Sequence, residues 1–249
     1  MRPEIAVNLY SAREALAYDL EGTLAAIARI GYRNVELAGY PGCSPEELNR
    51  LLRSHNLQAI SAHVPINRFE NELEVVIGEA RLLGLDALVV PWLSPEQRTV
   101  EYVKDLFAKL NAWGEKVREN RLRLAYHNHD FEYSIMLRDR SMMEILIADT
   151  HADFVDLEPD LYWIAAAGFD PVHQLQAMHP RVRMIHVKDR AADGSIANVG
   201  SGVLDWDGIF RAAEHDMANY LIVEHDHPTD LVADLTASYR FLSGRLATR

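Results

Sequence analysis

The 249-residue sequence is poor in cysteine and in positive charge. Cys43 is its only cysteine, so the chain cannot form an internal disulfide, and a reducing compartment is expected. Lys and Arg number 25 against 37 Asp and Glu, which gives a net charge of −12. Proteins that bind nucleic acid neutralise phosphates with clustered Lys and Arg, and no basic stripe occurs in this sequence. We therefore expect no nucleic-acid partner.

Long apolar runs are also missing. The N-terminal segment MRPEIAVNLYSAREAL holds no apolar stretch of signal-peptide length, and no run approaches the roughly 18 residues of a membrane span. Apolar residues make up 49% and charged residues 25%, which is typical of a globular domain and excludes a disordered chain. We expect a cytoplasmic protein without a membrane partner.

Short apolar runs alternate with amphipathic segments along the chain. Runs such as ALVV at 87–90 and YLIV at 220–223 are typical of parallel strands that are covered on both faces. The segment SPEELNRLLRSHN carries helix-start signals, with Ser44 as the N-cap and Pro45 in the first helical position. The eight strands that we expect cover residues 5–9, 34–37, 59–63, 87–91, 122–127, 154–157, 182–187 and 220–224.

Eight strands, each followed by a helical segment, predict a single-domain (β/α)8 TIM barrel over residues 1–249. The alternative is an open doubly wound sheet, which usually has fewer strands and a glycine-rich first turn. No GxGxxG pattern follows the first strand, and this favours the barrel. In such a barrel the active site lies where the strands end, because the loops that follow them converge there.

Polar side chains gather at these predicted strand ends. Side chains alternate along a strand, so His127 shares a face with His129, and His186 shares one with Lys188. Mixed nitrogen and oxygen ligands suit Mn, Co, Zn or Fe(II), and suit Mg less well. We therefore expect a divalent metal site on one rim of the barrel. The polar residues at the strand ends are Glu36, His63, His127, His129, Asp130, Glu132, Glu158, Asp160, His186, Lys188, Asp189, Glu224, His225, Asp226 and His227.

These residues are not equally informative. A lone histidine such as His63 is more often an ordinary hydrogen-bonded residue than a ligand, and a lone acid such as Glu36 is more often solvated or a helix cap. Asp160, His186 and Glu224 stand on consecutive strands and form the stronger ligand prediction. We expect His225 and His227, in a charged loop, to lie on the surface.

A glycine-containing loop, VGSGVLDWDGIF, follows the seventh predicted strand. Gly200 and Gly202 allow a close approach of the backbone, and Asp205 can cap the next helix. Such a loop can cradle a phosphate or fold over a substrate, and a plain turn is an equally good interpretation.

Several segments resemble the sugar phosphate isomerase/epimerase family, within the xylose-isomerase-like barrel superfamily. The superfamily also includes inosose dehydratases, ketose 3-epimerases, hydroxypyruvate isomerases and the endonuclease IV branch. The form YHNHDFE is more similar to the inosose-dehydratase branch than to the ketose epimerases. The segments are VELAGYPGCSPEEL, AISAHVP, YHNHDFEY, PDLYWIAAAGFDPV, IHVKD, VGSGVLDW and YLIVEHD.

The resemblance implies one divalent metal, held by Glu, Asp, His and Glu on strands five to eight. The last three correspond to Asp160, His186 and Glu224 in this sequence. His127 replaces the glutamate of strand five, and Glu132 is a second candidate for that ligand. The metal is expected to be Mn, Co, Zn, Fe or Mg. The resemblance also implies a homodimer.

These observations predict a metal-dependent isomerase or epimerase of a sugar, keto-sugar or polyol, with or without a phosphate. It would abstract a proton through a metal-stabilised enediolate. The expected catalytic residues are His129, Glu132, Lys188 and Glu224; Glu36, His63 and Trp163 are expected to bind the small carbohydrate substrate; His127, Asp160, His186 and Glu224 are the expected metal ligands.

Other functions remain open at this stage. The same rim of residues supports a dehydratase or another lyase of the inosose type, because loss of a β-hydroxyl can follow the same proton abstraction. A non-catalytic sugar-binding barrel is a further alternative. A nuclease of the endonuclease IV type is disfavoured, since it needs a basic groove and more metal ligands.

Overall fold

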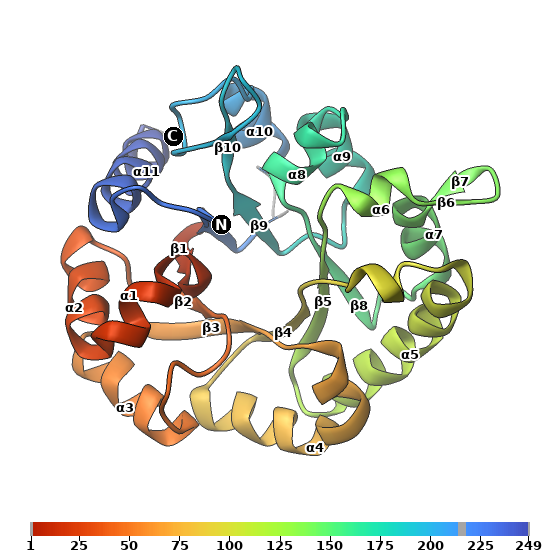
Figure 1. The fold of residues 1–249 in the computed structure, drawn as a ribbon, viewed down its shortest axis with the longest axis horizontal. Coiled ribbons are helices and arrows are strands. Elements are labelled where there is room, and N and C mark those ends of the chain that lie inside the picture. Colours follow the sequence, from red (N-terminus) through yellow and green to blue (C-terminus); the bar gives the residue numbers. More distant parts are fainter. Residues whose placement is uncertain (1, 214–217, 249) are drawn as a thin grey trace.

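The computed structural model describes residues 2–213 and 218–248. Eight parallel strands form one sheet in the order β8-β5-β4-β3-β2-β1-β12-β9, and helices surround it (Figure 1). This arrangement confirms the predicted single-domain (β/α)8 barrel. The barrel strands are β1 (Glu4–Asn8), β2 (Asn34–Leu37), β3 (Gln58–His63), β4 (Ala87–Val90), β5 (Arg123–His127), β8 (Val155–Glu158), β9 (Met184–Val187) and β12 (Tyr220–Val223).

The barrel closes least completely between β8 and β9, and we call this junction the β8–β9 seam. Two isolated bridges join the strands, Leu157 to Val182 and Asp160 to His186. Backbone hydrogen bonds cross the seam from the Leu157 N–H to the Arg181 carbonyl (2.8 Å) and from the His186 N–H to the Pro159 carbonyl (2.9 Å). The seam therefore lies directly beside two of the predicted metal ligands.

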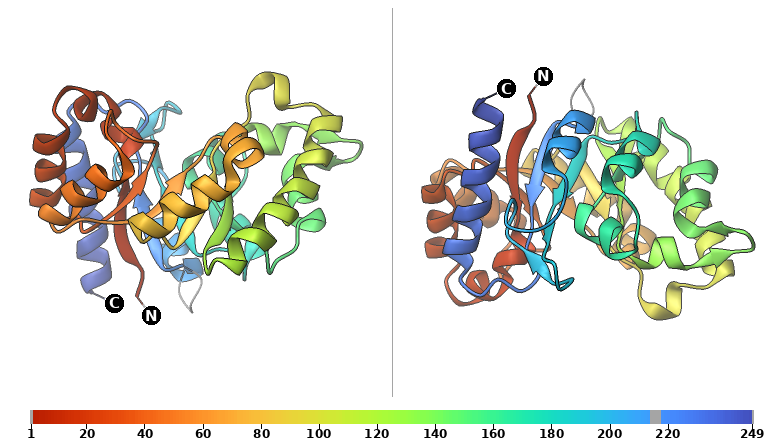
Figure 2. Two further views of the ribbon diagram at one scale, coloured as in Figure 1. Left: turned by 90° about the horizontal axis from the view of Figure 1, so that it is seen from below. Right: turned by 90° about the horizontal axis from the view of Figure 1, so that it is seen from above.

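The helices pack on the outside of the strands, and α11 packs against α2 and β1 (Figure 2). Ser44 accepts a hydrogen bond from the Glu47 amide and caps α3, as predicted. In the described residues, no helix is both long enough and apolar enough to cross a membrane. The helices are α1 (Arg13–Tyr18), α2 (Leu20–Ile30), α3 (Pro45–Ser54), α4 (Ile66–Leu83), α5 (Val100–Glu119), α6 (Phe131–Ser134), α7 (Met142–Asp149), α8 (Leu161–Ala166), α9 (Pro171–Met178), α10 (Trp206–Ala213) and α11 (Leu231–Ala247).

Short elements decorate the loops. Two-residue strands form hairpins, β6 (Met136–Leu137) with β7 (Arg140–Ser141) and β10 (Asp189–Arg190) with β11 (Ile196–Ala197). Single 3₁₀ turns cover Leu9–Ala12 and Pro95–Gln97.

The interior of the barrel changes from apolar to polar along the strands. Its apolar layer includes Ala125 on β5 and Met184 on β9. Side chains alternate with a period of two, so the residues two positions further along, His127 and His186, enter the same interior one layer higher. The strand direction thus places the polar layer at the carboxyl ends of the strands, where barrel enzymes carry their sites.

Candidate active site

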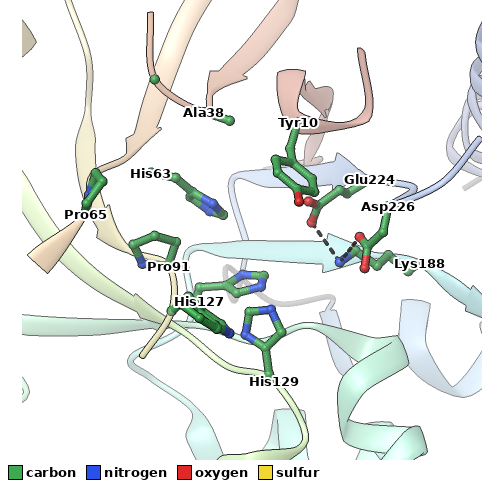
Figure 3. Close-up of a pocket in the computed structure, with 12 residues that line it drawn as sticks. Tyr10, Ala38, His63, Pro65, Pro91, His127, His129, Lys188, Glu224 and Asp226 are labelled. Atoms are coloured by element: carbon green, nitrogen blue, oxygen red, sulfur yellow. Dashed lines mark ion pairs between the residues drawn. The ribbon is translucent and has the colours of Figure 1, made fainter. Parts of the chain in front are cut away.

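A cavity of about 550 Å³ opens at the carboxyl ends of the strands (Figure 3). Its wall combines imidazoles and carboxylates with exposed aromatic rings, since Tyr10 is 42% and Trp92 46% exposed. The residues that line it are Tyr10, Ala38, Gly39, His63, Pro65, Pro91, Trp92, His127, His129, Lys188, Glu224 and Asp226.

The four predicted metal ligands lie together, and two of them, His127 and Glu224, line this cavity. His127, Asp160, His186 and Glu224 are all buried, and each offers one ligand atom within 4.8 Å of the others. His186 Nδ1 lies 2.8 Å from Glu224 Oε2, and His127 Nε2 lies 3.9 Å from Asp160 Oδ2. We call these four residues the ligand set.

Asp160 is held so that one oxygen stays available. As the N-cap of α8, it accepts the Trp163 amide with Oδ1 at 3.0 Å, and its own amide donates to Asn128 Oδ1. Its buried Oδ2 accepts no hydrogen bond from the described residues. Its charge is paired with the Lys188 ammonium group at 3.1 Å, and it lies beside two imidazoles and a second carboxylate, a mixed nitrogen and oxygen donor set that fits a divalent cation.

Both histidines of the ligand set contact a deeper carboxylate with their other ring nitrogen. His127 Nδ1 lies 3.1 Å from Glu158 Oε2, and His186 Nε2 lies 2.6 Å from Glu36 Oε2. A neutral imidazole has one N–H and one lone pair. Burial would lower the pKa of His186, but Glu158, Glu36 and Glu224 raise it well above its ordinary value, so without an ion this ring is protonated. A ring that gives up one proton to bind an ion and donates its remaining N–H downward would turn its lone pair to the ligand set, which is the usual carboxylate–histidine–metal arrangement.

Glu36 lies beneath the pocket, which differs from its expected place among the substrate-binding residues. It is fully buried, and it accepts hydrogen bonds from Asn8 Nδ2 and Ser61 Oγ, both at 2.7 Å. Burial alone would raise the pKa of Glu36, but the charges of His63 and His186 outweigh it and hold that pKa well below its usual range. Glu36 is therefore ionised at neutral pH, next to His186.

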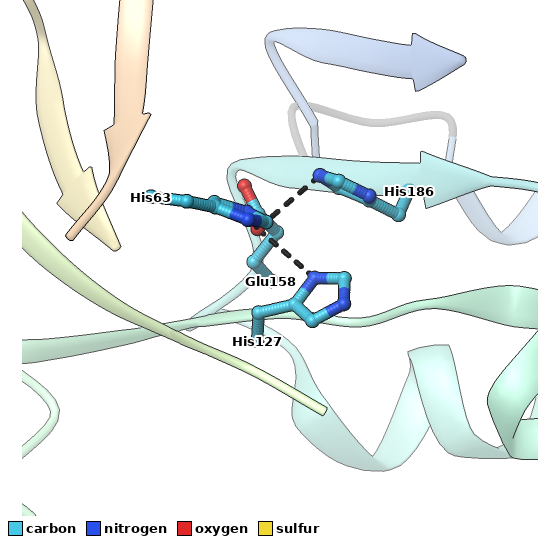
Figure 4. A group of neighbouring side chains, drawn as sticks. All are labelled: His63, His127, Glu158 and His186. Carbon is cyan, nitrogen blue, oxygen red and sulfur yellow. Dashed lines mark hydrogen bonds and ion pairs between the residues drawn. The ribbon is translucent and has the colours of Figure 1, made fainter. Parts of the chain in front are cut away.

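Glu158 was predicted to lie at the end of its strand with the other polar residues, but the sequence assigned it no role. It accepts from His63 Nε2 at 3.0 Å as well as from His127 (Figure 4). Its Oε1 is buried without a hydrogen-bond partner in the described residues. Burial and the neighbouring charge of Glu36 raise the pKa of Glu158 to about 7. Alternation along the strand places Glu158 on the same face as Asp160. Its role as an acceptor for two histidines becomes visible only in the folded barrel, where His63 reaches it from another strand.

Lys188 is buried among three carboxylates. Its Nζ lies 3.1 Å from Asp160 Oδ2, 2.9 Å from Glu224 Oε2 and 2.9 Å from Asp226 Oδ1 (Figure 3). Burial would lower the pKa of Lys188, but these anions raise it well above its ordinary value. The ammonium group is therefore charged and fixed on the cavity wall.

His129 also reaches the cavity, and Trp163 packs beside it. Their ring centroids are 5.2 Å apart, and Lys188 Nζ lies 5.7 Å from the Trp163 ring. Burial and the charge of Lys188 lower the pKa of His129 to about 3, so its ring is neutral at neutral pH. His129 Nδ1 and Trp163 Nε1 are buried and accept or donate no hydrogen bond among the described residues.

Glu132 does not join the ligand set. Its carboxyl group accepts from the Tyr126 hydroxyl at 2.9 Å and from the His129 amide at 2.8 Å. Because Tyr126 alternates with His127, this contact lies on the outer side of β5. Burial raises the pKa of Glu132 to about 8.

The glycine-containing loop after β9 surrounds a carboxylate of the chain itself. Asp189 Oδ2 accepts from the amides of Gly200 (2.9 Å) and Gly202 (3.0 Å) and from Trp206 Nε1 (2.6 Å). These N–H groups, which could have bound a phosphate, are therefore already hydrogen-bonded to Asp189. Asp205 accepts from the Gly208 amide and caps α10, as predicted.

The last two histidines of the sequence analysis lie at the edge of the site. His227 is exposed, and His225 is partly buried with its amide donating to Ser11 Oγ. Neither belongs to the ligand set.

A family model described as xylose isomerase-like TIM barrel matches residues 24–243. The match covers most of the chain, which therefore belongs to this family. The resemblance carried by the sequence motifs is thereby confirmed.

Individual relatives are distant. An inosose dehydratase from Geobacillus kaustophilus (strain HTA426) is 22% identical, with 83% of this chain and 80% of that protein aligned. A solved sugar phosphate isomerase/epimerase from Parabacteroides distasonis ATCC 8503 is 22% identical with a TM-score of 0.82, covering 97% of this chain and 98% of that one. A xylose isomerase-like TIM barrel protein from Mycobacterium smegmatis, solved in complex with magnesium, is 17% identical with a TM-score of 0.76, covering 100% of this chain and 97% of that one. The structural matches show a shared fold.

Proposed function

We propose that this protein is a metal-dependent isomerase or epimerase of a sugar, keto-sugar or polyol. The observation that carries the proposal is the ligand set, buried beside a cavity whose wall holds His129 and Lys188. His127, Asp160, His186 and Glu224 would hold the ion. Bound there, a divalent metal supplies a Lewis acid that stabilises negative charge on a substrate oxygen.

The side chains on the wall suit a proton transfer at carbon. His129 lines the cavity and its Nδ1 has no hydrogen-bond partner among the described residues, so it is the candidate to accept a proton from the substrate carbon next to a carbonyl. The Lys188 ammonium can donate a hydrogen bond to the oxygen that becomes negative. Return of the proton from His129 to the neighbouring carbon completes isomerisation. Epimerisation needs a second proton donor on the opposite face of the carbon, for which Glu224 on the cavity wall is the candidate.

His63, which lines the cavity, and Trp163, beside His129, are the proposed substrate contacts. Glu36, Glu158 and Glu132 act indirectly in this proposal. The first two orient the ligand histidines, and Glu132 holds the backbone amide of His129.

Dehydration is the second candidate. The relative from Geobacillus kaustophilus is an inosose dehydratase, and its alignment covers 83% of this chain. The same abstraction by His129, followed by departure of a β-hydroxyl group, gives an unsaturated product and water.

The first test is the metal content of the purified protein by elemental analysis. We expect about one divalent ion per chain, lost in the double variant Asp160→Ala, His186→Ala. The matched control is Asp153→Ala, His151→Ala, which removes the same residue types from exposed positions. A wild type that cannot be loaded with Mn, Co, Zn, Fe or Mg would contradict the proposal.

The reaction is then identified by incubating the loaded protein with keto-sugars and keto-polyols in D₂O. Deuterium at carbon without loss of water identifies an isomerase or epimerase, and loss of water identifies a dehydratase. A protein that binds sugars but exchanges no carbon-bound proton over the panel is a binding protein, and the catalytic proposal fails.

A further inference from the structure

A second hollow adjoins the cavity of the candidate active site, and we call it the side pocket. It has a volume of about 270 Å³ and lies between residues 9–17 and the loop 38–42, which follows β2. Ala38 and Gly39 line the side pocket and also line the cavity. The two spaces are therefore neighbours.

The border between the two spaces carries little side-chain bulk at the loop. Ala38 has only a methyl group, and a Cβ built at Gly39 would meet no atom within 4 Å. Figure 3 shows Ala38 on the same side of the cavity as Tyr10. Tyr10 lines the cavity and Arg13 lines the side pocket, and the Arg13 guanidinium lies over the Tyr10 ring at 4.2 Å. A molecule in the cavity can therefore extend past Ala38 and Gly39 into the side pocket.

The side pocket is lined mainly by apolar side chains. Leu9 and Leu16 are buried, and Ala17 and Pro41 add further apolar surface. Arg13 is the only charged residue among the described residues of this lining. Such a lining suits an apolar group, because hydroxyl groups that leave water need hydrogen-bond partners.

The cavity offers the opposite chemistry. Its wall presents His129, Lys188, Glu224 and Asp226, whose polar atoms suit hydroxyl and carbonyl groups. A second, fully hydroxylated sugar ring would lose hydrogen bonds in the side pocket. The contrast favours a ligand with one polar part and one apolar part over a disaccharide.

The loop that covers the side pocket is held in place. The Tyr40 hydroxyl donates to Glu79 Oε2 on α4 at 2.6 Å, and Arg68 donates to the two oxygens of the same carboxylate at 2.9 and 3.1 Å. Gly39 and Gly42 have φ values of +85° and +70°, the left-handed region that glycine adopts without strain. The side pocket therefore exists before a ligand binds, which lowers the entropic cost of binding.

We propose that the substrate has two parts, a sugar or polyol in the cavity and an apolar substituent, aryl or alkyl, in the side pocket. The inference rests on the proposed function and deepens it, because it names the substrate class as a substituted sugar such as an aryl glycoside. A dry apolar cavity of roughly 150 Å³ is large enough to bind benzene. A phenyl-sized group therefore fits the side pocket, whose volume is about 270 Å³.

Calorimetry on the metal-loaded protein compares methyl and phenyl D-glucopyranosides in both anomeric forms. We expect the phenyl glucoside of one anomer to bind about tenfold more tightly than the methyl glucoside of that anomer, because its ring leaves water. Phenyl glucosides that bind no more tightly than the methyl glucosides in both anomeric forms would overturn the inference.

The variant Ala17→Trp fills the side pocket from α1, and Ala17 does not line the cavity. We expect the preference for phenyl over methyl to disappear in this variant, while the affinity for the methyl glucoside stays the same. The matched control is Ala108→Trp, at an exposed position of α5, which should keep the preference. A preference that survives in Ala17→Trp would contradict the role of the side pocket.

Nuclear magnetic resonance of protein with ¹³C-labelled alanine methyl groups locates the substituent directly. The ring current of the phenyl glucoside should shift the Ala17 and Ala38 signals and leave that of Ala108 unchanged. Phenol alone, which needs neither a sugar nor a metal, should shift the Ala17 signal saturably at millimolar concentration. An Ala17 signal that neither probe moves would overturn the inference.

These outcomes are separable from those of the proposed function. Metal loading and exchange of a carbon-bound proton, without any effect of a phenyl group at Ala17, would leave the proposed function standing and remove the two-part substrate. Phenyl glucosides that shift Ala17 and Ala38 in a protein that exchanges no carbon-bound proton would keep the two-part ligand and remove the catalysis.

Discussion

Each ligand histidine lies between two carboxylates, one in the ligand set and one below it. His186 contacts Glu224 with one nitrogen and Glu36 with the other, and His127 faces Asp160 and Glu158 in the same way. An acceptor on one nitrogen fixes which tautomer is present and how the ring is turned. The deeper carboxylates, Glu36 and Glu158, therefore fix the tautomer and the orientation in which the imidazoles would bind a metal ion.

Replacing a deeper carboxylate should weaken metal binding without removing a ligand. We expect Glu36→Gln to lower metal affinity by about 10–100-fold, because the amide no longer provides an anionic acceptor for His186. Chelator competition measures the dissociation constant. Glu72→Gln, a half-exposed glutamate of α4 paired with Arg68, is the matched control and should bind metal as the wild type does. Equal affinities for Glu36→Gln and wild type would contradict the positioning role.

Glu132 makes stability depend on pH. Burial raises its pKa to about 8 in the folded protein, whereas an unfolded glutamate titrates near about 4.3. Between these two pKa values Glu132 is protonated in the folded chain and ionised in the unfolded chain. Protonation of Glu132 therefore stabilises the fold fully below about pH 4, and this stabilisation is lost as the pH rises to about 8. Its slope is at most about 1.4 kcal/mol per pH unit.

The variant Glu132→Gln cannot bind this proton. Urea unfolding across this pH range should therefore show the wild type losing stability more steeply than Glu132→Gln as the pH rises. Exposed Glu46→Gln is the control and should follow the wild type. Parallel curves for wild type and Glu132→Gln would contradict the raised pKa.

The four residues that the sequence predicts as ligands lie together in the structure. Their juxtaposition could be predicted because alternation along single strands and the motifs of the family need no tertiary information. Sequence reasoning listed Glu36 and Glu158 at the strand ends but did not predict their contacts with the ligand histidines. Glu36 comes from β2 and contacts His186 of β9, a pairing that exists only once the barrel has curved around. Such contacts depend on the register of the strands and on the closure of the barrel, and neither can be inferred from the residues that flank Glu36 in the sequence.

Among the elements, the barrel strands were predicted to within a few residues, since buried parallel strands appear as apolar runs. The hairpins β6–β7 and β10–β11 were not predicted. Their strands are two residues long, too short to show any period. The glycines predicted the loop between β9 and α10. The sequence did not predict that the Asp189 carboxylate, from the preceding motif IHVKD, accepts the hydrogen bonds of this loop.

The tight loop makes Gly202 sensitive to substitution. We expect Gly202→Ala to lower the free energy of unfolding by about 1–3 kcal/mol, because the new Cβ would collide with the Arg190 carbonyl. Gly78→Ala on α4 is the control: its Cβ meets no atom within 4 Å, so the variant should be as stable as the wild type or up to about 1 kcal/mol more stable. Urea denaturation of both variants checks the contrast. Equal free energies of unfolding for Gly202→Ala and Gly78→Ala would show that the loop can move to accommodate the new Cβ.

On the scale of the whole molecule, the ligand set spans the β8–β9 seam. His127 and Asp160 belong to its β5–β8 side, and His186 and Glu224 to its β9–β12 side. An ion held by all four would connect the two edges that the backbone joins by only isolated bridges.

Hydrogen exchange should reveal this. We expect the amides of Leu157 and His186, which cross the seam, to exchange faster than that of Leu124 in the continuous ladder between β4 and β5. Metal loading should slow the seam amides by about tenfold or more and change Leu124 less. A uniform slowing over all three amides would show that the seam has no separate opening.

Arg181 gives the seam a further consequence. Its guanidinium donates to the Val155 carbonyl from Nε (3.0 Å) and Nη2 (2.8 Å), and its own carbonyl accepts the Leu157 amide, so it secures the end of the seam opposite the ligand set. Binding free energies between coupled sites are reciprocal. If an ion disfavours opening of the seam by some factor, opening disfavours the ion by the same factor. If the protein binds a metal as proposed, we therefore expect a substitution of Arg181, which contacts no ligand atom, to lower metal affinity by favouring the open seam.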